Sequence, residues 1–196
     1  MSAGSPPSTV EVFVADEQSA HPIDADRWLR LALQVLMAEG VDGSGEGVEM
    51  SLLFVDESAI AALNEQFMGK SGPTDVLSFP IDVEASPRHI PPLAIAAPIG
   101  APSPMPISDD DDDDEQPLLL GDVVICPSVA AANASEHQSD HHDGGVADEI
   151  ALLVVHGILH LLGMDHMDDA EAEKMESREQ ELLALFHRFD GKKASS

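Results

Sequence analysis

The feature that most constrains this chain is the stretch Val146–Leu162, in which apolar residues dominate. Gly163 follows directly, and glycine is the residue that most often ends a helix. The stretch is shorter than the ~18 consecutive apolar residues that a membrane span requires. We therefore predict a buried helix at the centre of a folded domain, and no membrane partner.

Two histidines of this helix, His156 and His160, lie four residues apart. They therefore project from one face of the helix, and this spacing suits two imidazole ligands on one metal ion. After the turn at Gly163, His166 is close enough to be a third ligand. Three nitrogen ligands leave a fourth position open for water, as in catalytic zinc sites. The H-x3-H-x5-H motif thus predicts a zinc ion on a central helix.

Other interpretations of these histidines are weaker. One histidine on an apolar helix is usually a core residue, but burying three without partners would be costly. Zinc proteases carry H-E-x-x-H, with the glutamate as general base, and here that position is Gly157. Peptide hydrolysis by that route is therefore not expected. The other histidines are not expected to bind the metal. His137, His141 and His142 lie in a polar stretch without helical register, which favours a surface position, and His21, His89 and His187 have no ligand-like partners nearby in sequence.

The charge of the chain limits its partners. Against 37 acidic residues stand 9 lysines and arginines, a formal net charge of −28. This balance disfavours partners held by charge alone, such as duplex DNA or anionic lipid. The only cysteine, Cys126, excludes an intrachain disulfide, and we expect it to be a small buried residue rather than a nucleophile. Without a secretory signal, the chain is expected in the cytoplasm.

Strand and helix patterns are mixed without regular alternation, which predicts an α+β fold with a small mixed sheet packed against helices. Asp24 and Asp56 are expected to cap two of the helices. The expected strands cover residues 9–15, 49–55, 74–80 and 118–126, and the expected helices cover 24–39, 56–69, 128–137, 146–162 and 168–189.

We predict one domain, a metal-dependent hydrolase, over residues 9–190. Residues 1–8 and 191–196 are expected to be disordered tails. Residues 84–117 contain eight of the 14 prolines and a run of acidic residues. We interpret them as a largely disordered surface insertion whose purpose the pattern does not reveal.

Three sequence blocks resemble signatures of one family. H-G-I-L-H-L-L-G-M-D-H, residues 156–166, resembles the H-G-x-L-H-L-x-G-x-D-H signature of the YbeY family, bacterial rRNA maturation factors regarded as metal-dependent endoribonucleases. P-T-D-V-L-S-F-P, residues 73–80, and L-G-D-V-V-I-C, residues 120–126, resemble two further blocks of that family. The resemblance extends over residues 48–186, apart from the insertion.

The resemblance implies an α+β fold with one zinc ion per chain on His156, His160 and His166. It implies a single-strand-specific endoribonuclease acting in 3′-end maturation of 16S rRNA and in ribosome quality control. The implied partners are single-stranded rRNA and the small ribosomal subunit or its proteins. The nucleophile would be either a metal-activated water or the 2′-hydroxyl of the RNA. The alternative is a non-catalytic ribosome-assembly factor whose zinc is structural.

The chain departs from the family pattern before the P-T-D block. Many members carry an aromatic–arginine pair there, whereas this chain has Phe67 and Met68. No arginine role can be carried over, and Lys70 is the nearest cation. Lys70 together with Arg27 and Arg30 is one candidate patch for RNA phosphates.

The candidates for catalytic roles beyond the metal ligands are few. Asp165, beside His166, could orient a ligand, and a helix-end or turn contact fits it equally well. Lys70 and Ser78 could contact the substrate. Two other acidic residues of the matched blocks, Asp75 and Asp122, fit turn and strand-edge geometry equally well.

Overall fold

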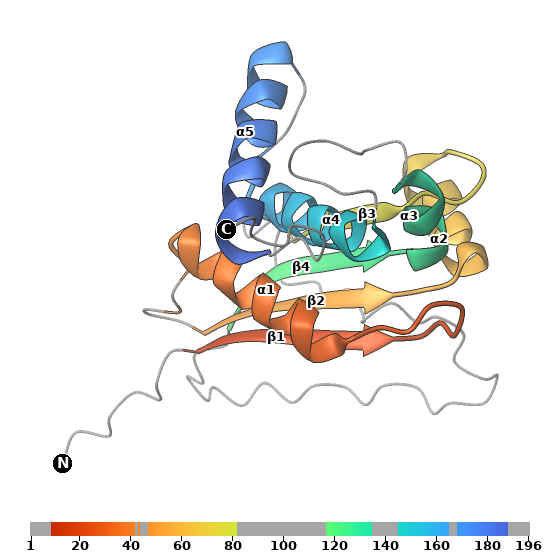
Figure 1. The fold of residues 1–196 in the computed structure, drawn as a ribbon, viewed down its shortest axis with the longest axis horizontal. Helices are drawn as coiled ribbons and strands as arrows, with labels where there is room; N and C mark the ends of the chain where they lie inside the picture. Colours follow the sequence, from red (N-terminus) through yellow and green to blue (C-terminus); the bar gives the residue numbers. More distant parts are fainter. Residues whose placement is uncertain are drawn as a thin grey trace, which may run out of the picture.

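The computed structural model describes residues 9–41, 43, 47–81, 117–134, 145–164 and 168–187 (Figure 1). The predicted insertion, except Pro117, and the two predicted tails lie outside the described residues, as do Asp165 and His166. The strands are β1 (Val10–Asp16), β2 (Val48–Phe54), β3 (Val76–Pro80) and β4 (Leu118–Ile125). The helical segments are α1 (Ala25–Ala38), α2 (Glu57–Leu63), η1 (Asn64–Met68), α3 (Pro127–Asn133), α4 (Val146–Leu161) and α5 (Asp169–Phe186).

The four strands form one mixed sheet in the order β1-β2-β4-β3. Strands β1, β2 and β4 run parallel, while β3 pairs antiparallel with β4 at one edge. Pro80 ends β3, which agrees with the restriction of proline to edge strands. The mixed α+β class predicted from the sequence is confirmed.

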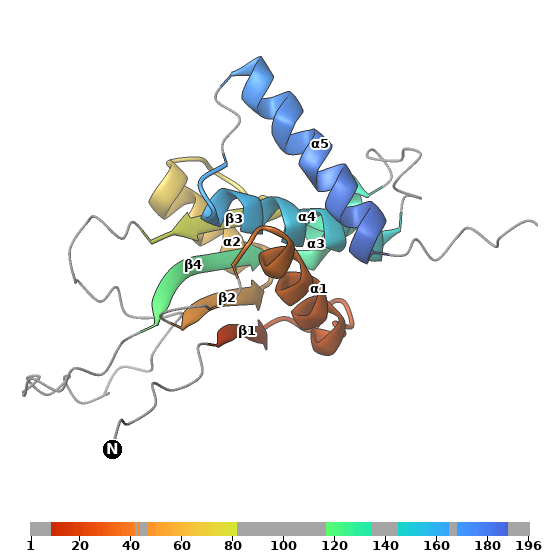
Figure 2. The same cartoon turned by 90° about the vertical axis from the view of Figure 1, so that its left-hand side faces the viewer.

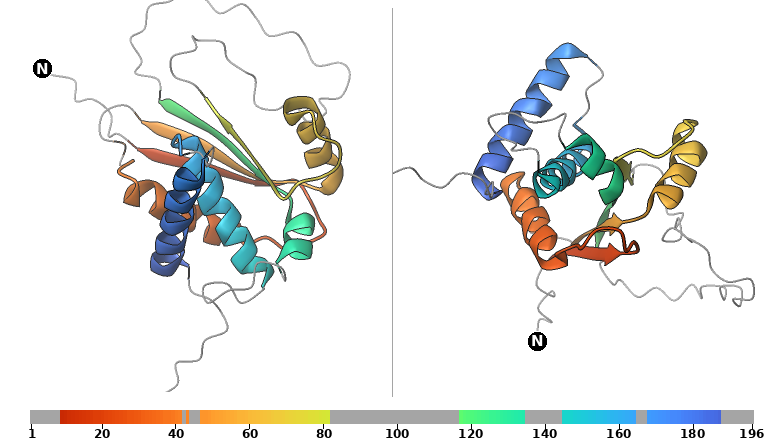
Figure 3. Two further views of the ribbon diagram at one scale, coloured as in Figure 1. Left: turned by 90° about the horizontal axis from the view of Figure 1, so that it is seen from above. Right: turned by 45° about the vertical axis from the view of Figure 1, so that its right-hand side comes forward.

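Helices cover the two faces of this sheet unequally. On one face, Val123 and Ile125 of β4 pack in a core with residues of α1, α4 and α5. On the other face, Val124 and Leu77 pack against Ile60 of α2. Because alternate residues of a strand face opposite sides, β4 contributes to both cores. Figures 2 and 3 show α1, α4 and α5 gathered on one side of the sheet and α2 on the other.

The helix α4 is the central helix that its composition predicts. It contacts α1, α3, α5, β3 and β4, and most of its residues are buried. At its end Gly163 adopts φ 84°, with the Gly163 N–H on the His160 carbonyl and the Met164 N–H on the Leu159 carbonyl. This pair of bonds is a Schellman motif, which confirms the predicted glycine stop.

Two predicted helix caps are confirmed. The Asp24 side chain accepts a hydrogen bond from the Arg27 N–H, and the Asp56 side chain accepts one from the Ala59 N–H. The Ser58 hydroxyl also donates to Asp56, and this bond lowers the pKa of the Asp56 carboxyl. These side chains satisfy backbone donors that the first helical turn leaves without partners.

One predicted helix is interrupted. The sequence predicts a single helix over 56–69, but α2 ends at Leu63 and the chain continues as a π-helical turn, η1. Asn64, the first residue of η1, is buried and donates from Nδ2 to the Gly72 carbonyl at 2.9 Å. This tertiary bond holds the segment that leads to β3, and helical periodicity alone does not reveal it. No helix among the described residues is long and apolar enough to cross a membrane.

Candidate functional site

The two histidines of α4 face each other. The His156 and His160 Nε2 atoms lie 3.0 Å apart, and the ring planes are inclined by 82° with centroids 4.5 Å apart. One helical turn separates the residues, so the helix itself sets this proximity. Both imidazoles therefore direct the same ring nitrogen to one point.

The other ring nitrogen of each histidine has an acceptor. His160 Nδ1 lies 2.9 Å from the Met164 carbonyl oxygen, and His156 Nδ1 lies 2.6 Å from Glu179 Oε1. A carbonyl oxygen and a carboxylate only accept, so each Nδ1 donates. The two Nε2 atoms lie at hydrogen-bond distance from each other, and in the neutral tautomers with protonated Nδ1 their lone pairs are available to bind one metal ion.

These residues fit a zinc site. Zn–N distances of ~2.0–2.1 Å in a tetrahedral site place two ligand nitrogens roughly 3.4 Å apart, close to the separation of the two Nε2 atoms. Zinc-binding histidines also typically donate their second ring N–H to a carboxylate or a backbone carbonyl. The described residues contain no group of three metal-binding side chains. His166, the predicted third ligand, lies outside them and stays a prediction.

Sequence reasoning missed Glu179. Glu179 lies on α5 and is only 8% exposed. Its neighbours at helical spacing, Met175 and Leu182, are buried apolar residues. A carboxylate in the apolar stripe of a helix was the available signal, because a buried charge requires a partner. The carboxylate considered for this role from the sequence, Asp165, is outside the described residues.

The histidines open onto a cleft of about 690 Å³. Two of the predicted catalytic candidates, Lys70 and Ser78, line it as well. The structure thus brings together α4, β3 and the segment after η1. The whole lining consists of Asn64, Met68, Lys70, Thr74, Val76, Leu77, Ser78, Pro80, His156, His160, Gly163 and Met164.

Gly157 faces the sheet rather than the cleft. A Cβ at this position would lie 2.5 Å from Val123 Cγ1 and 3.2 Å from Ser78 Oγ. The first distance is shorter than any ordinary contact, so α4 packs this closely only because the residue is glycine. A glutamate has no room here, which supports the prediction that the H-E-x-x-H chemistry is absent.

The two acidic residues of the matched blocks do not line the cleft. Asp75 Oδ1 accepts from the Val76 N–H and the Thr74 hydroxyl, and Oδ2 accepts from Asn133 of α3. The bonds to Thr74 and Val76 are the local turn chemistry that the sequence suggests, and the bond to Asn133 holds the start of β3 to α3. Asp122 lies within β4, opposite Phe79 of β3.

Cys126 is fully buried beside α3. Burial raises the pKa of its thiol above the ordinary value, so the reactive thiolate is disfavoured at neutral pH. The expectation that Cys126 is a core residue is confirmed.

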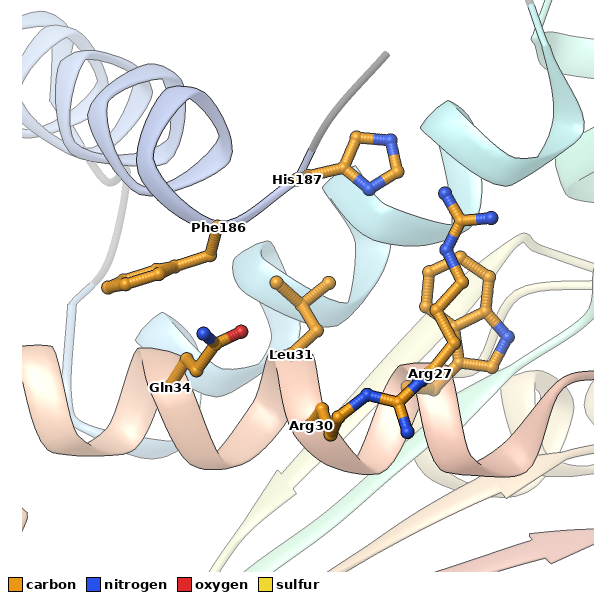
Figure 4. A pocket seen from close by; sticks show the side chains of 7 residues that line it. Arg27, Arg30, Leu31, Gln34, Phe186 and His187 are labelled. Carbon is orange, nitrogen blue, oxygen red and sulfur yellow. The ribbon is translucent and has the colours of Figure 1, made fainter. Parts of the chain in front are cut away.

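Arg27 and Arg30 do not share the cleft with Lys70. They line a separate groove of about 390 Å³ between α1 and the end of α5 (Figure 4). The Arg27 guanidinium lies 4.9 Å from the centre of the Trp28 ring. His187, also in this groove, pairs with the buried Asp148 at 2.6 Å. The prediction of one cationic patch that includes Lys70, Arg27 and Arg30 is therefore wrong, because packing places the two arginines and the lysine in separate grooves.

Comparison with known proteins gives consistent matches. The family model described as Endoribonuclease YbeY matches residues 13–187. An Endoribonuclease YbeY of Thermobifida fusca is 41% identical over 91% of this chain and 96% of that protein. One of Salinispora tropica is 40% identical over 89% of this chain and 95% of that protein. A solution structure from Thermotoga maritima aligns at 22% identity and a TM-score of 0.47, over 93% of this chain and 100% of that one.

Proposed function

This chain belongs to the endoribonuclease YbeY family, and on that premise we propose that it is a metal-dependent endoribonuclease that cleaves single-stranded rRNA. The observation that carries the proposal is the convergence of the His156 and His160 Nε2 atoms in an open cleft. We extend the proposal to 3′-end maturation of 16S rRNA and ribosome quality control in the cytoplasm, with the small ribosomal subunit as partner.

His156, His160 and His166 would hold the metal, and the donor set suits zinc. When bound, zinc would supply a Lewis acid for the phosphodiester and for water. The chain itself supplies orientation. The Met164 carbonyl accepts from the His160 ring, and the Glu179 carboxylate accepts from the His156 ring. These bonds fix the orientation of both rings, so each Nε2 already faces the metal position.

Two side chains of the cleft would contact the substrate. The Lys70 ammonium offsets the negative charge of the phosphate, which grows in the transition state. The Ser78 hydroxyl can donate to a phosphate oxygen or to the leaving 5′-oxygen. Neither role needs the arginine that this chain lacks. The nucleophile in this proposal is either a water or the RNA 2′-hydroxyl.

The test is cleavage of a single-stranded RNA that carries the 3′ end of 16S rRNA. We expect His160→Ala to lose bound zinc and cleavage while circular dichroism shows the fold retained. The matched control is His21→Ala, which removes a histidine of the loop before α1 and should cleave as wild type.

A second variant separates the enzyme from a non-catalytic assembly factor. Lys70→Met should keep zinc and fold but slow cleavage by about 100-fold, the lower end of the loss when one preorganised electrostatic contact to a transition state is removed. If folded, zinc-loaded wild-type protein cuts no RNA, the nuclease proposal fails, and the non-catalytic assembly factor with a structural zinc replaces it.

A further inference from the structure

Arginine side chains gather in a groove apart from the histidine cleft. Arg27 and Arg30 of α1 both line the groove of about 390 Å³ between α1 and the end of α5. Among the described residues, Lys70 is the sole lysine or arginine that lines the cleft, and no carboxylate lines the groove. In a chain with a net charge of −28, such a cationic hollow is suited to an anion.

The α1 helix sets the spacing of the polar side chains in this groove. Arg27, Arg30 and Gln34 are separated by three and four residues, so they share one face of the helix. Figure 4 shows this face opposite Phe186 and His187, at the end of α5. Side chains at such spacing have Cβ atoms about 5–6 Å apart, and those of Arg30 and Gln34 are exposed. Several of these side chains can therefore contact one small ligand.

The opposite wall of the groove is held by two contacts of α5. His187 Nε2 lies 2.6 Å from Asp148 Oδ1, and both residues are buried, so the end of α5 is tied to the start of α4. Further back along α5, Arg178 pairs at 2.7 Å with Glu39, which follows α1. These contacts fix α5 against α1. The groove is therefore formed before any ligand arrives, as most small-molecule sites are.

Trp28 adds a buried aromatic wall. It is only 3% exposed, and the Arg27 guanidinium lies 4.9 Å from the centre of its ring. Among the described residues no acceptor meets the Trp28 Nε1–H, so the fold leaves one donor of this wall unsatisfied. The volume of about 390 Å³ lies at the small end of the ~300–1,000 Å³ typical of ligand sites, which suits a ligand the size of a sugar phosphate.

We propose that this groove is a second binding site, for a phosphate monoester such as a sugar phosphate or the 5′-phosphate end of an RNA chain. A phosphate monoester carries a charge of about −1.5 to −2 at pH 7. Guanidinium groups bind its oxygens through pairs of N–H donors, a geometry that lysine does not offer. A phosphodiester inside an RNA strand carries only a single negative charge, so it matches two arginines less well.

The inference does not rest on the proposed function. The groove lies beside the start of α4, where His187 meets Asp148, whereas His156 and His160 lie in the second half of that helix. The groove and the cleft share no described lining residue. Failure of the nuclease proposal would therefore leave the phosphate site standing, and the reverse also holds.

Trp28 is the single tryptophan of the chain, so its fluorescence reports on the groove. Inorganic phosphate and ribose 5-phosphate, titrated at constant ionic strength, should change this fluorescence in a saturable way. Arg30→Gln should raise the dissociation constant at least about tenfold, the usual loss for a hydrogen bond to a charged group. Arg30→Lys should fall between Arg30→Gln and wild type, because lysine keeps the charge but loses the planar fork of donors.

The chain offers a matched control. Lys174→Gln removes an exposed cation of α5 that does not line the groove, so it should bind phosphate as wild type does. Thermal melting of each variant checks the fold. If a 5′-phosphorylated oligoribonucleotide gives the fluorescence change and its 5′-hydroxyl counterpart does not, an RNA end is the ligand. If the small compounds alone give it, the ligand is a free sugar phosphate. Both outcomes support the site.

Three outcomes would overturn the proposal. The first is that neither phosphate compound changes the fluorescence of the folded wild-type protein. The second is that Lys70→Met loses the binding while Arg30→Gln keeps it, which would place the phosphate in the cleft. The third is a response to hexaglutamate without one to phosphate, which would assign the groove to an acidic peptide.

Discussion

At the scale of single residues, the site depends on which nitrogen of each imidazole faces the cleft. The Met164 carbonyl and the Glu179 carboxylate occupy the Nδ1 atoms, so both Nε2 atoms are directed to one point. Only one of these two orienting groups is a side chain that mutation can change without moving the backbone. Glu179 is therefore the residue through which the proposed metal site can be tuned.

We predict that Glu179→Gln lowers zinc affinity by about tenfold, because the amide keeps the shape and an acceptor oxygen but loses the charge that polarises His156. Competition with a chromogenic chelator measures the affinity. Glu173→Gln, an exposed glutamate of the same helix, is the control. Equal affinities in Glu179→Gln and wild type would show that Glu179 serves packing alone.

Gly157 is a second residue with a sharp expectation. Gly157→Ala should lower the free energy of unfolding by about 1–3 kcal/mol, the usual cost of overpacking, although alanine is the better helix former. The reason is the 2.5 Å approach of the new Cβ to Val123 Cγ1. Urea denaturation measures the loss.

A compensating variant checks the cause. Adding Val123→Ala removes the atom in conflict, so the double variant should lose less stability than the sum of the single variants. Strict additivity of the two changes would show that the cost of Gly157→Ala arises elsewhere.

At the scale of elements, the position of α5 decides whether Glu179 reaches His156. Arg178, beside Glu179, ties α5 to the end of α1, where its Nε lies 2.7 Å from Glu39 Oε1. The hydrogen bond with Glu39 is also the main reason that the pKa of Arg178 is raised. The ion pair is partly buried, so salt screens it less than a fully exposed pair.

We predict that Arg178→Ala lowers the free energy of unfolding by about 1 kcal/mol, because it removes a charge-assisted bond between two helices. The loss should be smaller at high salt, which screens the pair. Thermal or urea unfolding at two salt concentrations measures both effects. Lys174→Ala, one turn earlier on the exposed side of α5, should change stability little.

At the scale of the whole molecule, acidity and RNA cleavage have to coexist. Among the described residues that line the cleft, Lys70 is the sole lysine or arginine. Arg178 is engaged by Glu39, and Arg27 and Arg30 line the other groove. RNA bound at this cleft would therefore meet few cationic side chains, and few counterions would be released from its phosphates.

We accordingly predict a shallow salt dependence of RNA binding. One phosphate contact to single-stranded RNA gives a slope of about −0.7 when the logarithm of the binding constant is plotted against that of salt concentration. Anisotropy titrations between low and physiological salt measure it. A slope several times steeper would show that cations outside the described cleft residues hold the RNA.

Local features of this protein could be predicted from the sequence. The apolar stretch that forms α4, the glycine stop at Gly163, the aspartate caps and the mixed sheet all follow from periodicity and turn chemistry, which act over a few residues. The shared face of His156 and His160 follows in the same way, because the helix alone sets a separation of four residues.

Tertiary structure decided what surrounds that pair. Glu179 reaches His156 across 23 positions of the chain, and Lys70 and Ser78 join the histidines through the placement of β3 at the sheet edge. Packing also separated the arginines of α1 from Lys70 and replaced the end of a predicted helix with η1. Such contacts depend on how whole elements pack rather than on local preference. The sequence by itself thus determined the paired histidines and the fold class, whereas only the assembled fold determined their partners.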